Sequence, residues 1–348
     1  MKCCLVIDIS KINLKIISVV LREDKIFMQE IHRCSKILIR NKDSKLSLNI
    51  DKIIKEINEA LVSVKQIGYN VESISVNSSI NEFVLLDEHD NLVRDIFVEY
   101  SLNSNYLNKI INELGMAYIY RKTGISFNLN NALYKLMMYR DLYPEDFLKV
   151  RKILSFSDYT NYRLTGEIFH ERAQLSLTQI FNFKNQDIDE DILNYLDLKD
   201  RLEFNLVDYG KSVGKCKING VEVIAPYGNN LLSSFLTTDV TNKNSIFIVN
   251  SYEGIIGCTE NFSKMYLEGI KFDLNHQLFN EELVKIFKYI PCYRLVDDFL
   301  KNVENNYMIE NAWNVMNDNE FIDYIIDFDS DIFRNSAALI NTVKYYFE

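Results

Sequence analysis

A turn at residues 225–234, which reads APYGNNLLSS, has the residue types and the spacing of a site that could hold an anion or a reactive group. The apolar run VEVIAPY ends at Pro226 and Gly228, and a segment with helical character begins at Asn229 and Asn230. A helix start offers unpaired N–H donors and the positive end of the helix dipole. Two neutral amides occupy that position here, so the turn is either a helix cap or an active site without its acid.

Phosphate-binding loops are the second kind of chemistry to consider, because they need glycine where the backbone approaches a phosphate. The chain has 11 glycines in 348 residues, which is less than half of the usual share of about 7%. Neither GxGxxG nor GxxxxGK[ST] occurs in the sequence. Composition therefore does not support a nucleotide site.

Metal chemistry has no support in the spacing of cysteine, histidine or acidic residues. The sequence contains no CxxC pair and no histidine at metal-ligand spacing from a cysteine, so the 6 cysteines are interpreted as reduced thiols. The acidic runs DIDED and DFDSD lack the glycine and the distal glutamate of an EF-hand loop, and are read as helix starts or surface acids. We therefore expect no metal site and no disulfide framework.

Charge and hydropathy restrict the partners and the location of the protein. The formal net charge of -10 disfavours binding to nucleic acid or to an anionic membrane surface. No stretch approaches the roughly 18 apolar residues of a membrane span, and the first residues lack a signal-peptide pattern. The sequence therefore predicts a cytoplasmic protein with neither nucleic acid nor membrane as a partner.

The elements that must position these residues begin with three strands. Residues 4–21 read as two strands joined by a turn at Ser10–Asn13, and DKIFMQEIHRCSK supplies a third strand. IDKIIKEINEALVSVKQIGYN is an amphipathic helix that stops at Gly68, and VESISVNSS is a buried strand. Three antiparallel strands followed by a helix and a further strand predict an α/β protein with the actin-like, ribonuclease-H-like ATPase fold that some phosphotransferases use.

The middle of the chain is predicted to be helical, with Asp158 as the N-cap of one helix. Strands resume in KSVGKCKINGVEVIAPY and again in SIFIVNSYEGIIGCTE, and the tail from Asn280 is predicted to be mainly helical. The most polar short stretch, TDVTNKNS, runs from Thr238 to Ser245 and marks the predicted change of domain. The predicted domains are residues 1–240 and 241–348.

Several stretches together resemble the FGGY carbohydrate kinases, and within them the rhamnulokinase branch. The longest is TGISFNLNNALYKLMMYRDLYPEDFLKVRKILSFSDYTNYRLTGE, and NEFVLLDEHDNLV, CLVIDIS and VEVIAPYGNNLLSS also match family segments. The resemblance implies a complete first, sugar-side domain of the actin-like fold. It also implies a truncated, incomplete second domain, because it weakens after about residue 260 and the family's adenine-binding loop has no counterpart.

For phosphate binding, the resemblance places Asp8 at the family's aspartate in the first strand and Ser10 at a glycine of the phosphate hairpin. A Cβ at that glycine position is expected to push the backbone away from a phosphate. Lys15 stands where the branch has an arginine, and the second phosphate hairpin corresponds to a stretch that contains Ser251 and Glu253. Because Glu253 would place a negative charge near a triphosphate, these positions are interpreted as vestigial.

For the sugar and the catalytic base, the resemblance points to further losses. The family's DTWGVD stretch corresponds to Asn77 through Glu82, its YRD motif begins at Tyr100, and the four residues of its GHDT motif correspond to GNNL, with Asn229 and Asn230 at the histidine and the aspartate. That aspartate is the family's general base. Asparagine cannot take the proton of a sugar hydroxyl at physiological pH, and a general base contributes about 10² to 10⁴ in rate. The sugar-binding positions are likewise interpreted as vestigial.

Four interpretations stay open at the level of the sequence. The first is a catalytically silent sugar-kinase homologue that acts as a binding or scaffold protein. The others are an active ATP-dependent carbohydrate kinase, a split kinase completed by a separate chain, and a decaying gene product without function. The first predicts no cofactor, with ATP and Mg²⁺ required only if activity is retained, and a homodimer or a partner protein over the truncated second domain.

Overall fold

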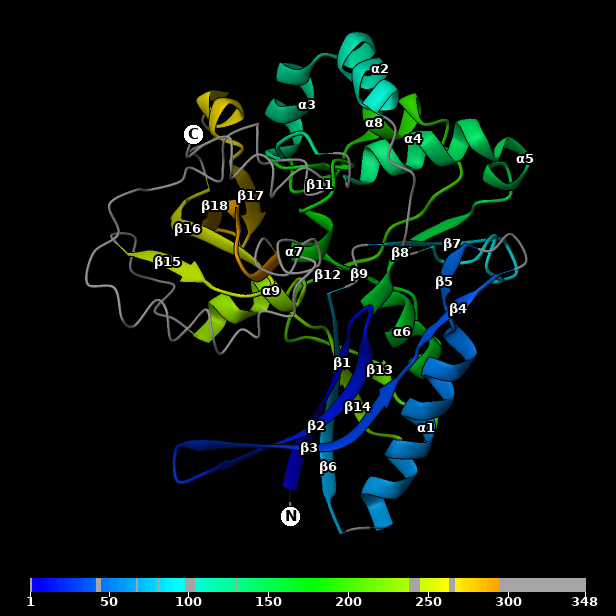
Figure 1. Ribbon diagram of the computed structural model, residues 1–348, viewed down its shortest axis with the longest axis vertical. Coiled ribbons are helices and arrows are strands. Elements are labelled where there is room, and N and C mark those ends of the chain that lie inside the picture. Colours follow the sequence, from blue (N-terminus) through cyan, green and yellow to red (C-terminus); the bar gives the residue numbers. More distant parts are fainter. Residues whose placement is uncertain are drawn as a thin grey trace, which may run out of the picture.

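The computed structural model describes residues 2–41, 45–66, 68–79, 82–97, 104–128, 131–237, 245–262 and 267–294, and Figure 1 shows their arrangement. The strands are β1 (Lys2–Ile9), β2 (Asn13–Arg22), β3 (Lys25–Ser35), β4 (Leu38–Arg40), β5 (Leu46–Leu48), β6 (Asn70–Ser78), β7 (Phe83–Leu86), β8 (Lys152–Ser155), β9 (His170–Glu171), β10 (Phe181–Asn182), β11 (Asp187–Ile188), β12 (Leu206–Val207), β13 (Ser212–Lys215), β14 (Glu222–Ile224), β15 (Ile246–Val249), β16 (Glu253–Asn261), β17 (Asn275–Leu278) and β18 (Leu283–Pro291). The helices are α1 (Ile50–Gln66), α2 (Ser104–Leu114), α3 (Met116–Thr123), α4 (Ala132–Leu142), α5 (Pro144–Phe147), α6 (Phe156–Thr165), α7 (Arg172–Leu175), α8 (Glu190–Tyr195), α9 (Asn230–Ser233), η1 (Ser234–Thr237) and η2 (Leu267–Phe272). None of these described helices is long and apolar enough to cross a membrane.

A six-stranded sheet, in the order β13-β14-β6-β1-β2-β3, forms the lower part of the molecule in Figure 1. β1 and β2 are antiparallel, as are β2 and β3, whereas β6 runs parallel to β1 and β14 runs parallel to β6. Helix α1 connects the antiparallel strands to β6. This order is that of a ribonuclease-H-like unit, so the predicted fold class is confirmed.

Alternation along β1 explains how this sheet is held in place. Every second side chain of the strand is buried in one apolar cluster, while Asp8 between them is half-buried. The amphipathic α1 contributes its apolar stripe to the same cluster. Each fully buried aliphatic side chain contributes about 1.5–3 kcal/mol to folding. The shared cluster includes Cys3, Leu5, Ile7 and Ile9 from β1 and Ile53, Ile57 and Leu61 from α1.

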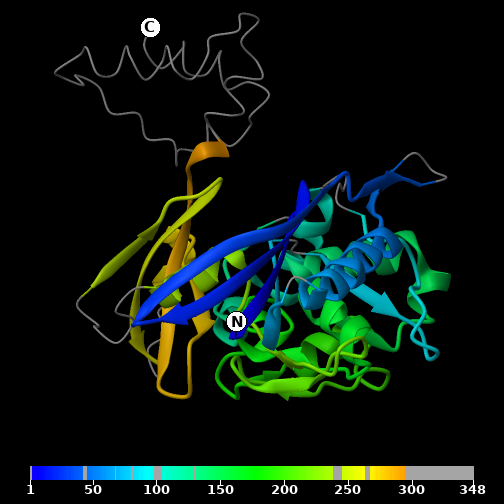
Figure 2. The same ribbon diagram turned by 90° about the horizontal axis from the view of Figure 1, so that it is seen from below.

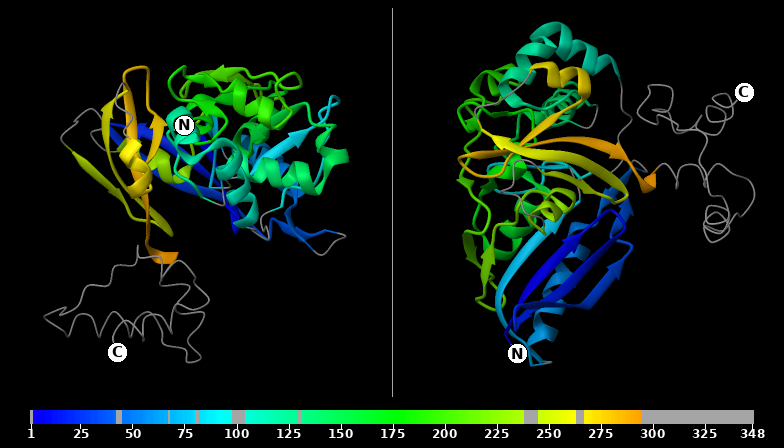
Figure 3. Two further views of the ribbon diagram at one scale, coloured as in Figure 1. Left: turned by 90° about the horizontal axis from the view of Figure 1, so that it is seen from above. Right: turned by 90° about the vertical axis from the view of Figure 1, so that its left-hand side faces the viewer.

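A second sheet, in the order β15-β16-β18-β17, is antiparallel throughout. It lies beside the helical layer and the short helices α7 and α9, as Figures 2 and 3 show. Leu278 and Ile286 of this sheet belong to one apolar cluster with Ile119 and Leu133 of the helical layer. The second sheet therefore shares one core with the helical layer.

The N-cap predicted for α6 is wrong by three residues. Ser155 is the N-cap, and its hydroxyl oxygen accepts a hydrogen bond from the Asp158 backbone N–H at 3.1 Å. Asp158 instead lies in the first turn, with its side chain buried. Serine and aspartate are comparable N-caps. The helix begins after Ser155 because strand β8 ends at that residue.

The helical prediction for the tail from Asn280 is also wrong where the structure describes it, because residues 283–291 form β18. This strand pairs with β16 on one side and β17 on the other, and its side chains from 283 to 287 are all buried. Burial on both faces removes the alternation that identifies a strand in a sequence. Residues 295–348 lie outside the described residues, as does the predicted domain boundary at 240/241, so the domain division stays a prediction.

The hairpin of β2 and β3 projects from the first sheet, at the lower left of Figure 1. Leu21, Ile26 and Met28 on this hairpin are 70%, 67% and 73% exposed. β3 is also the last strand of its sheet in the described part of the chain. The hairpin therefore combines a free strand edge with exposed apolar side chains.

Candidate active site

The turn that carries Asn229 and Asn230 has the predicted strand–turn–helix form. It follows β14, and Gly228 adopts a φ of 56° in the left-handed region. A Cβ on Gly228 would lie 2.7 Å from the Gln277 side-chain nitrogen, so only glycine fits at this position. Asn229 is the N-cap of α9, and its side-chain oxygen accepts the Leu232 backbone N–H at 3.1 Å. The helix-cap interpretation is therefore correct for Asn229, whose side chain serves the turn itself.

Asn230 and Asp8, which the sequence analysis placed in separate motifs, are brought together. The Asn230 side-chain Nδ2 donates a hydrogen bond to the Asp8 Oδ1 at the end of β1. The Asn230 Oδ1 is buried and accepts no hydrogen bond among the described residues. The neutral amide donates to the carboxylate at any pH, whereas an ionised aspartate at 230 would face Asp8 with a second negative charge.

Asn77 lies next to Asp8, because β1 and β6 pair in a register that sets these two residues side by side. Its Nδ2 donates to the Ser233 hydroxyl at 2.9 Å, and its Oδ1 accepts the Ser78 backbone N–H at 2.8 Å. Asp8, Asn77, Asn230 and Ser233 therefore form one polar group, which we name the Asp8–Asn230 cluster. It ties the first helical turn after β14 to the central strands of the sheet.

Ser10 and Lys15 flank this cluster on the first hairpin. The Ser10 hydroxyl accepts the Asn13 backbone N–H at 3.2 Å and donates to the Asn13 carbonyl at 3.1 Å, so it closes the β1–β2 turn. Lys15 stands directly opposite Asp8 in the antiparallel register. Opposite residues of such a pair project on the same face, so one positive charge lies beside the Asp8 carboxylate.

The remaining predicted site residues are not part of the Asp8–Asn230 cluster. Ser251 is exposed in the turn between β15 and β16, where its carbonyl accepts the Tyr293 backbone N–H at 3.3 Å. Glu253, on the same turn, forms an ion pair with Arg294 at 3.6 Å between Oε1 and Nε. Tyr100 lies outside the described residues.

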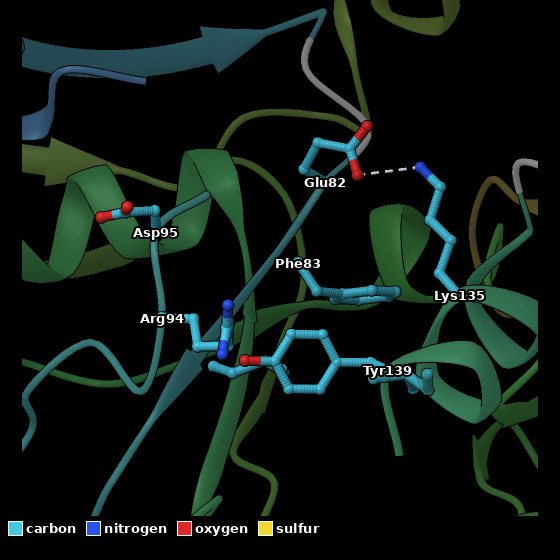
Figure 4. Close-up of a pocket in the computed structure, with 8 residues that line it drawn as sticks. Glu82, Phe83, Arg94, Asp95, Lys135 and Tyr139 are labelled. Atoms are coloured by element: carbon cyan, nitrogen blue, oxygen red, sulfur yellow. Dashed lines mark hydrogen bonds and ion pairs between the residues drawn. The ribbon is translucent and has the colours of Figure 1, made fainter. Parts of the chain in front are cut away.

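Glu82 lines a narrow pocket between β7 and α4, shown in Figure 4. Its carboxylate is 2.9 Å from the Lys135 ammonium, and the two residues are only 5% and 6% exposed. The one acid that the sugar-binding stretch retains is therefore neutralised by a buried cation. A ligand would have to displace that ion pair to reach it.

Glu171 is a functional residue that the sequence analysis missed. Its Oε2 accepts the Gly228 backbone N–H at 2.9 Å and the Gln174 N–H at 2.7 Å, and its Oε1 accepts the Ala173 N–H at 2.9 Å. Burial raises the pKa of the Glu171 carboxyl to about 8, although these hydrogen bonds act in the opposite direction. Glu171 thus caps α7 and holds the Gly228 turn at the same time.

Lys285, on β18, holds the other end of the turn. Its ammonium donates to the Leu232 carbonyl at 3.0 Å, and it lies 4.3 Å from the centre of the Phe235 ring and 4.6 Å from that of Tyr227. Burial lowers the pKa of Lys285 well below its usual range, while Glu171 acts to raise it. Neither residue carried a sequence signal, because Lys285 lies within an apolar run and Glu171 precedes a helix of only four residues.

No group of three or more His, Cys, Asp or Glu side chains that could hold a metal ion occurs among the residues described. A nucleotide triphosphate also fits the first hairpin poorly, since the Ser10 hydroxyl occupies the turn that would have to receive a phosphate. Asp8, a possible ligand for a divalent cation, is bonded to Asn230. The arrangement can orient small polar groups, but it holds no proton acceptor at position 230.

Comparison with known proteins gives one family and one fold. The model of the FGGY family of carbohydrate kinases, N-terminal domain, matches residues 3–225. A rhamnulokinase of Oceanobacillus iheyensis is 25% identical over 99% of this chain and 74% of its own length, and one of Bacillus subtilis is 22% identical over 98% of this chain and 71% of its own.

Solved structures agree with this family. A ligand-bound xylulose kinase from Lactobacillus acidophilus has a TM-score of 0.76 at 16% identity, over 91% of this chain and 66% of that one. A glycerol kinase from Plasmodium falciparum with ADP has a TM-score of 0.75 at 13% identity, over 92% of this chain and 67% of that one. The chain thus spans about two thirds to three quarters of the length of these relatives, and the resemblance found in the sequence is confirmed.

Proposed function

The chain belongs to the FGGY family of carbohydrate kinases, and from this premise we propose that it is a catalytically impaired member, a pseudokinase that acts as a binding or scaffold protein. The observation that carries the proposal is the hydrogen bond from the Asn230 amide to Asp8. By resemblance, position 230 is that of the general base. It is occupied here by a hydrogen-bond donor.

The chemical consequence is a missing proton acceptor. A sugar hydroxyl must lose its proton as it attacks a phosphoryl group, and an amide oxygen is too weak a base to take that proton at neutral pH. The loss is worth about 10² to 10⁴ in rate. Positioning alone still contributes to phosphoryl transfer, but without a base and a glycine-lined phosphate hairpin the expected turnover is too slow to give ADP above background.

The phosphate side supports the same proposal. Ser10 closes its own turn with both donor and acceptor interactions, and Glu253, paired with Arg294, places a carboxylate at the start of β16 next to the turn that carries Ser251. Kinases of this family use ATP and Mg²⁺. In this chain the first hairpin is not lined by glycine, and the Asp8 carboxylate already accepts a hydrogen bond from Asn230.

An active ATP-dependent carbohydrate kinase is the alternative that one observation favours. Two hydrogen bonds hold the strand–turn–helix unit around Gly228: Glu171 accepts the Gly228 N–H, and Lys285 donates to the Leu232 carbonyl. Asp8 and Lys15 also keep their adjacent places in the first hairpin. Such a unit would position a substrate hydroxyl even without a base.

The test is ADP formation by the full chain with Mg-ATP and each of rhamnulose, xylulose, gluconate and glycerol. These compounds follow the names of the family relatives. We expect no ADP above the level given by the Asp8→Ala variant. ADP that forms with one compound and disappears in Asp8→Ala would overturn the proposal and establish the alternative.

The binding role requires a partner, and we propose a second copy of the chain or another protein over the second domain. Light scattering across a concentration series reports the first case directly. A monomer at every concentration would contradict the homodimer. Combined with ADP formation in the preceding test, it would overturn both the impaired activity and the binding role.

A further inference from the structure

The pocket between β7 and α4 has polar atoms that no described contact uses. It is lined by Glu82, Phe83, Arg94, Asp95, Lys135 and Tyr139, together with two leucines. In Figure 4 the Arg94 guanidinium and the Tyr139 hydroxyl lie next to each other, on the far side of the Phe83 ring from the Glu82–Lys135 pair. One end of the pocket is therefore formed by the Glu82–Lys135 ion pair, and the other end by the Arg94 guanidinium and the Tyr139 phenol.

The phenol end is unsatisfied. Tyr139 is 7% exposed, and its hydroxyl has no hydrogen-bond partner among the described residues. The Arg94 Nε is also buried and has no acceptor in the part of the chain that the structure describes. A buried polar atom without a partner costs on the order of 1–3 kcal/mol, so two such atoms beside one pocket indicate a ligand oxygen that they share. Burial raises the pKa of Tyr139 further above its ordinary value, so the phenol remains protonated at neutral pH.

The charges around the pocket select a neutral ligand. The Arg94 Nη1 donates to the Asp146 carboxylate at 2.7 Å, and its guanidinium stacks 3.8 Å from the centre of the Tyr143 ring. Lys135 is paired with Glu82 at 2.9 Å. Each lining cation thus already has a carboxylate, and the remaining lining charge is the exposed Asp95. An anion would meet this carboxylate without gaining a new counter-ion.

We propose that this pocket binds a hydroxyl group of a small neutral polyol. The hydroxyl oxygen accepts the Arg94 Nε–H and forms a second hydrogen bond with the Tyr139 phenol, while the carbon skeleton lies against the Phe83 ring. A hydroxyl suits both partners because it is donor and acceptor at once. The inference goes beyond the proposed function, because it depends on Arg94 and Tyr139 and not on the Asp8–Asn230 cluster.

The experiment is a titration of the full chain with glycerol, followed by NMR through the Arg94 Nε–H signal. That signal is assigned by its absence in Arg94→Lys. We expect a saturable shift in the wild type and a roughly tenfold weaker response in Tyr139→Phe, which is the loss expected for one hydrogen bond. Tyr143→Phe is the matched control: the Tyr143 hydroxyl accepts from Lys45 at 2.8 Å outside the pocket, so its response should equal that of the wild type.

Three results would overturn the inference. One is a linear, non-saturating shift, which indicates a solvent effect with only water in the pocket. The second is an identical response in Tyr139→Phe and in the wild type. The third is saturation by acetate at lower concentration than by glycerol, which would make the site an anion site. Since no ATP is present, none of these results depends on whether phosphoryl transfer is impaired.

Discussion

At the scale of single residues, the proposed loss of activity depends on Asn230, whose amide donates a hydrogen bond to Asp8. The same side chain also contributes to folding, since a hydrogen bond to a charged group is worth about 1.5–3 kcal/mol. Function and stability are therefore opposed at this position. Restoring the carboxylate of an active kinase would remove a native contact.

Replacing Asn230 with aspartate is expected to destabilise the protein without restoring turnover. Two carboxylates in hydrogen-bond contact repel each other, so the free energy of unfolding should fall by about 1–3 kcal/mol at pH 7 and recover in part at pH 4–5, where one of them is protonated. Urea unfolding at both pH values measures this. Asn230→Ala, which loses the hydrogen bond without the repulsion, should show no such recovery.

Tyr139→Phe is expected to leave the ligand-free protein as stable as the wild type or slightly more stable. The substitution removes a buried hydroxyl that has no partner. Tyr120→Phe is the matched comparison, because the Tyr120 hydroxyl donates to the Leu274 carbonyl at 3.0 Å and its loss should cost about 1 kcal/mol. Equal losses in the two variants, measured by thermal unfolding, would contradict this assignment.

At the scale of elements, the short helix α9 depends on neighbours that are distant in sequence. β1 contacts it through Asp8 and β18 through Lys285, while Glu171 at the end of β9 holds the Gly228 turn that precedes it. A helix of four residues is far below the length that is stable alone. These contacts, rather than helix propensity, hold the turn.

Stability is expected to fall as the pH rises from about 4 to about 8, through Glu171 and Asp158. Burial raises the pKa of Glu171 to about 8 and that of Asp158 to about 7. The folded state therefore binds their protons more tightly than the unfolded state, so their stabilisation is complete below the unfolded values near 4 and is lost as the pH rises through the folded values. The effect should be on the order of a few kcal/mol.

Lys285 has a depressed pKa, so its titration changes stability in the opposite sense at higher pH. Glu171→Gln keeps Lys285 and removes the titration of Glu171, so the difference between the variant and the wild type reports Glu171. Chemical unfolding at pH 5, 6.5 and 8 gives the two curves. We expect a shallower decline in the variant. Parallel curves would show that the Glu171 carboxyl does not titrate with folding in this window.

Lys285→Met should loosen α9 while changing overall stability little. Methionine has a similar volume and removes the cost of a buried amine, but it cannot donate to the Leu232 carbonyl. Hydrogen exchange of the α9 amides should become at least several-fold faster, with a global unfolding free energy within about 1 kcal/mol of the wild type. Unchanged exchange at α9 would contradict the role given to Lys285.

At the scale of the whole molecule, the second sheet docks on the helical layer through tight backbone contacts. The Asn275 Oδ1 accepts from the Ser126 N–H at 3.1 Å and from its hydroxyl at 3.0 Å, and the His276 N–H donates to the Gly124 carbonyl at 3.0 Å. A Cβ on Gly124 would lie 2.9 Å from the His276 Cβ. The two parts should therefore unfold together.

Gly124→Ala is expected to lower the midpoint of one cooperative transition, by about 1–3 kcal/mol in unfolding free energy, because the methyl group clashes with His276. Gly210→Ala is the control. Gly210 has a similar left-handed φ of 76° but nothing within 4 Å of the added Cβ, so it reports backbone strain alone. Equal midpoints for the two variants, or two separate transitions for Gly124→Ala, would show that the second sheet and the helical layer are not coupled in this way.

Local patterns were enough to predict the first sheet and the turn at Asn229. The alternation in β1 and the stripe of α1 are properties of adjacent residues, and the capping role of Asn229 needs only the helix start that follows it. β18 could not be found in this way, since a strand buried on both faces has no alternation. Glu171 and Lys285 could not be predicted either, because their partners lie 57 and 53 residues away in the chain.

The projecting hairpin of β2 and β3 has a consequence for concentrated solutions of the protein. Its exposed Leu21, Ile26 and Met28 lie on strands at a free edge, which is a template for pairing with another chain. The net charge of -10 keeps copies of the chain apart at low ionic strength. Added salt weakens this repulsion, because the screening length falls to about 10 Å at 0.1 M. We therefore expect added salt to promote association through this hairpin and dilute buffers to keep the protein dispersed.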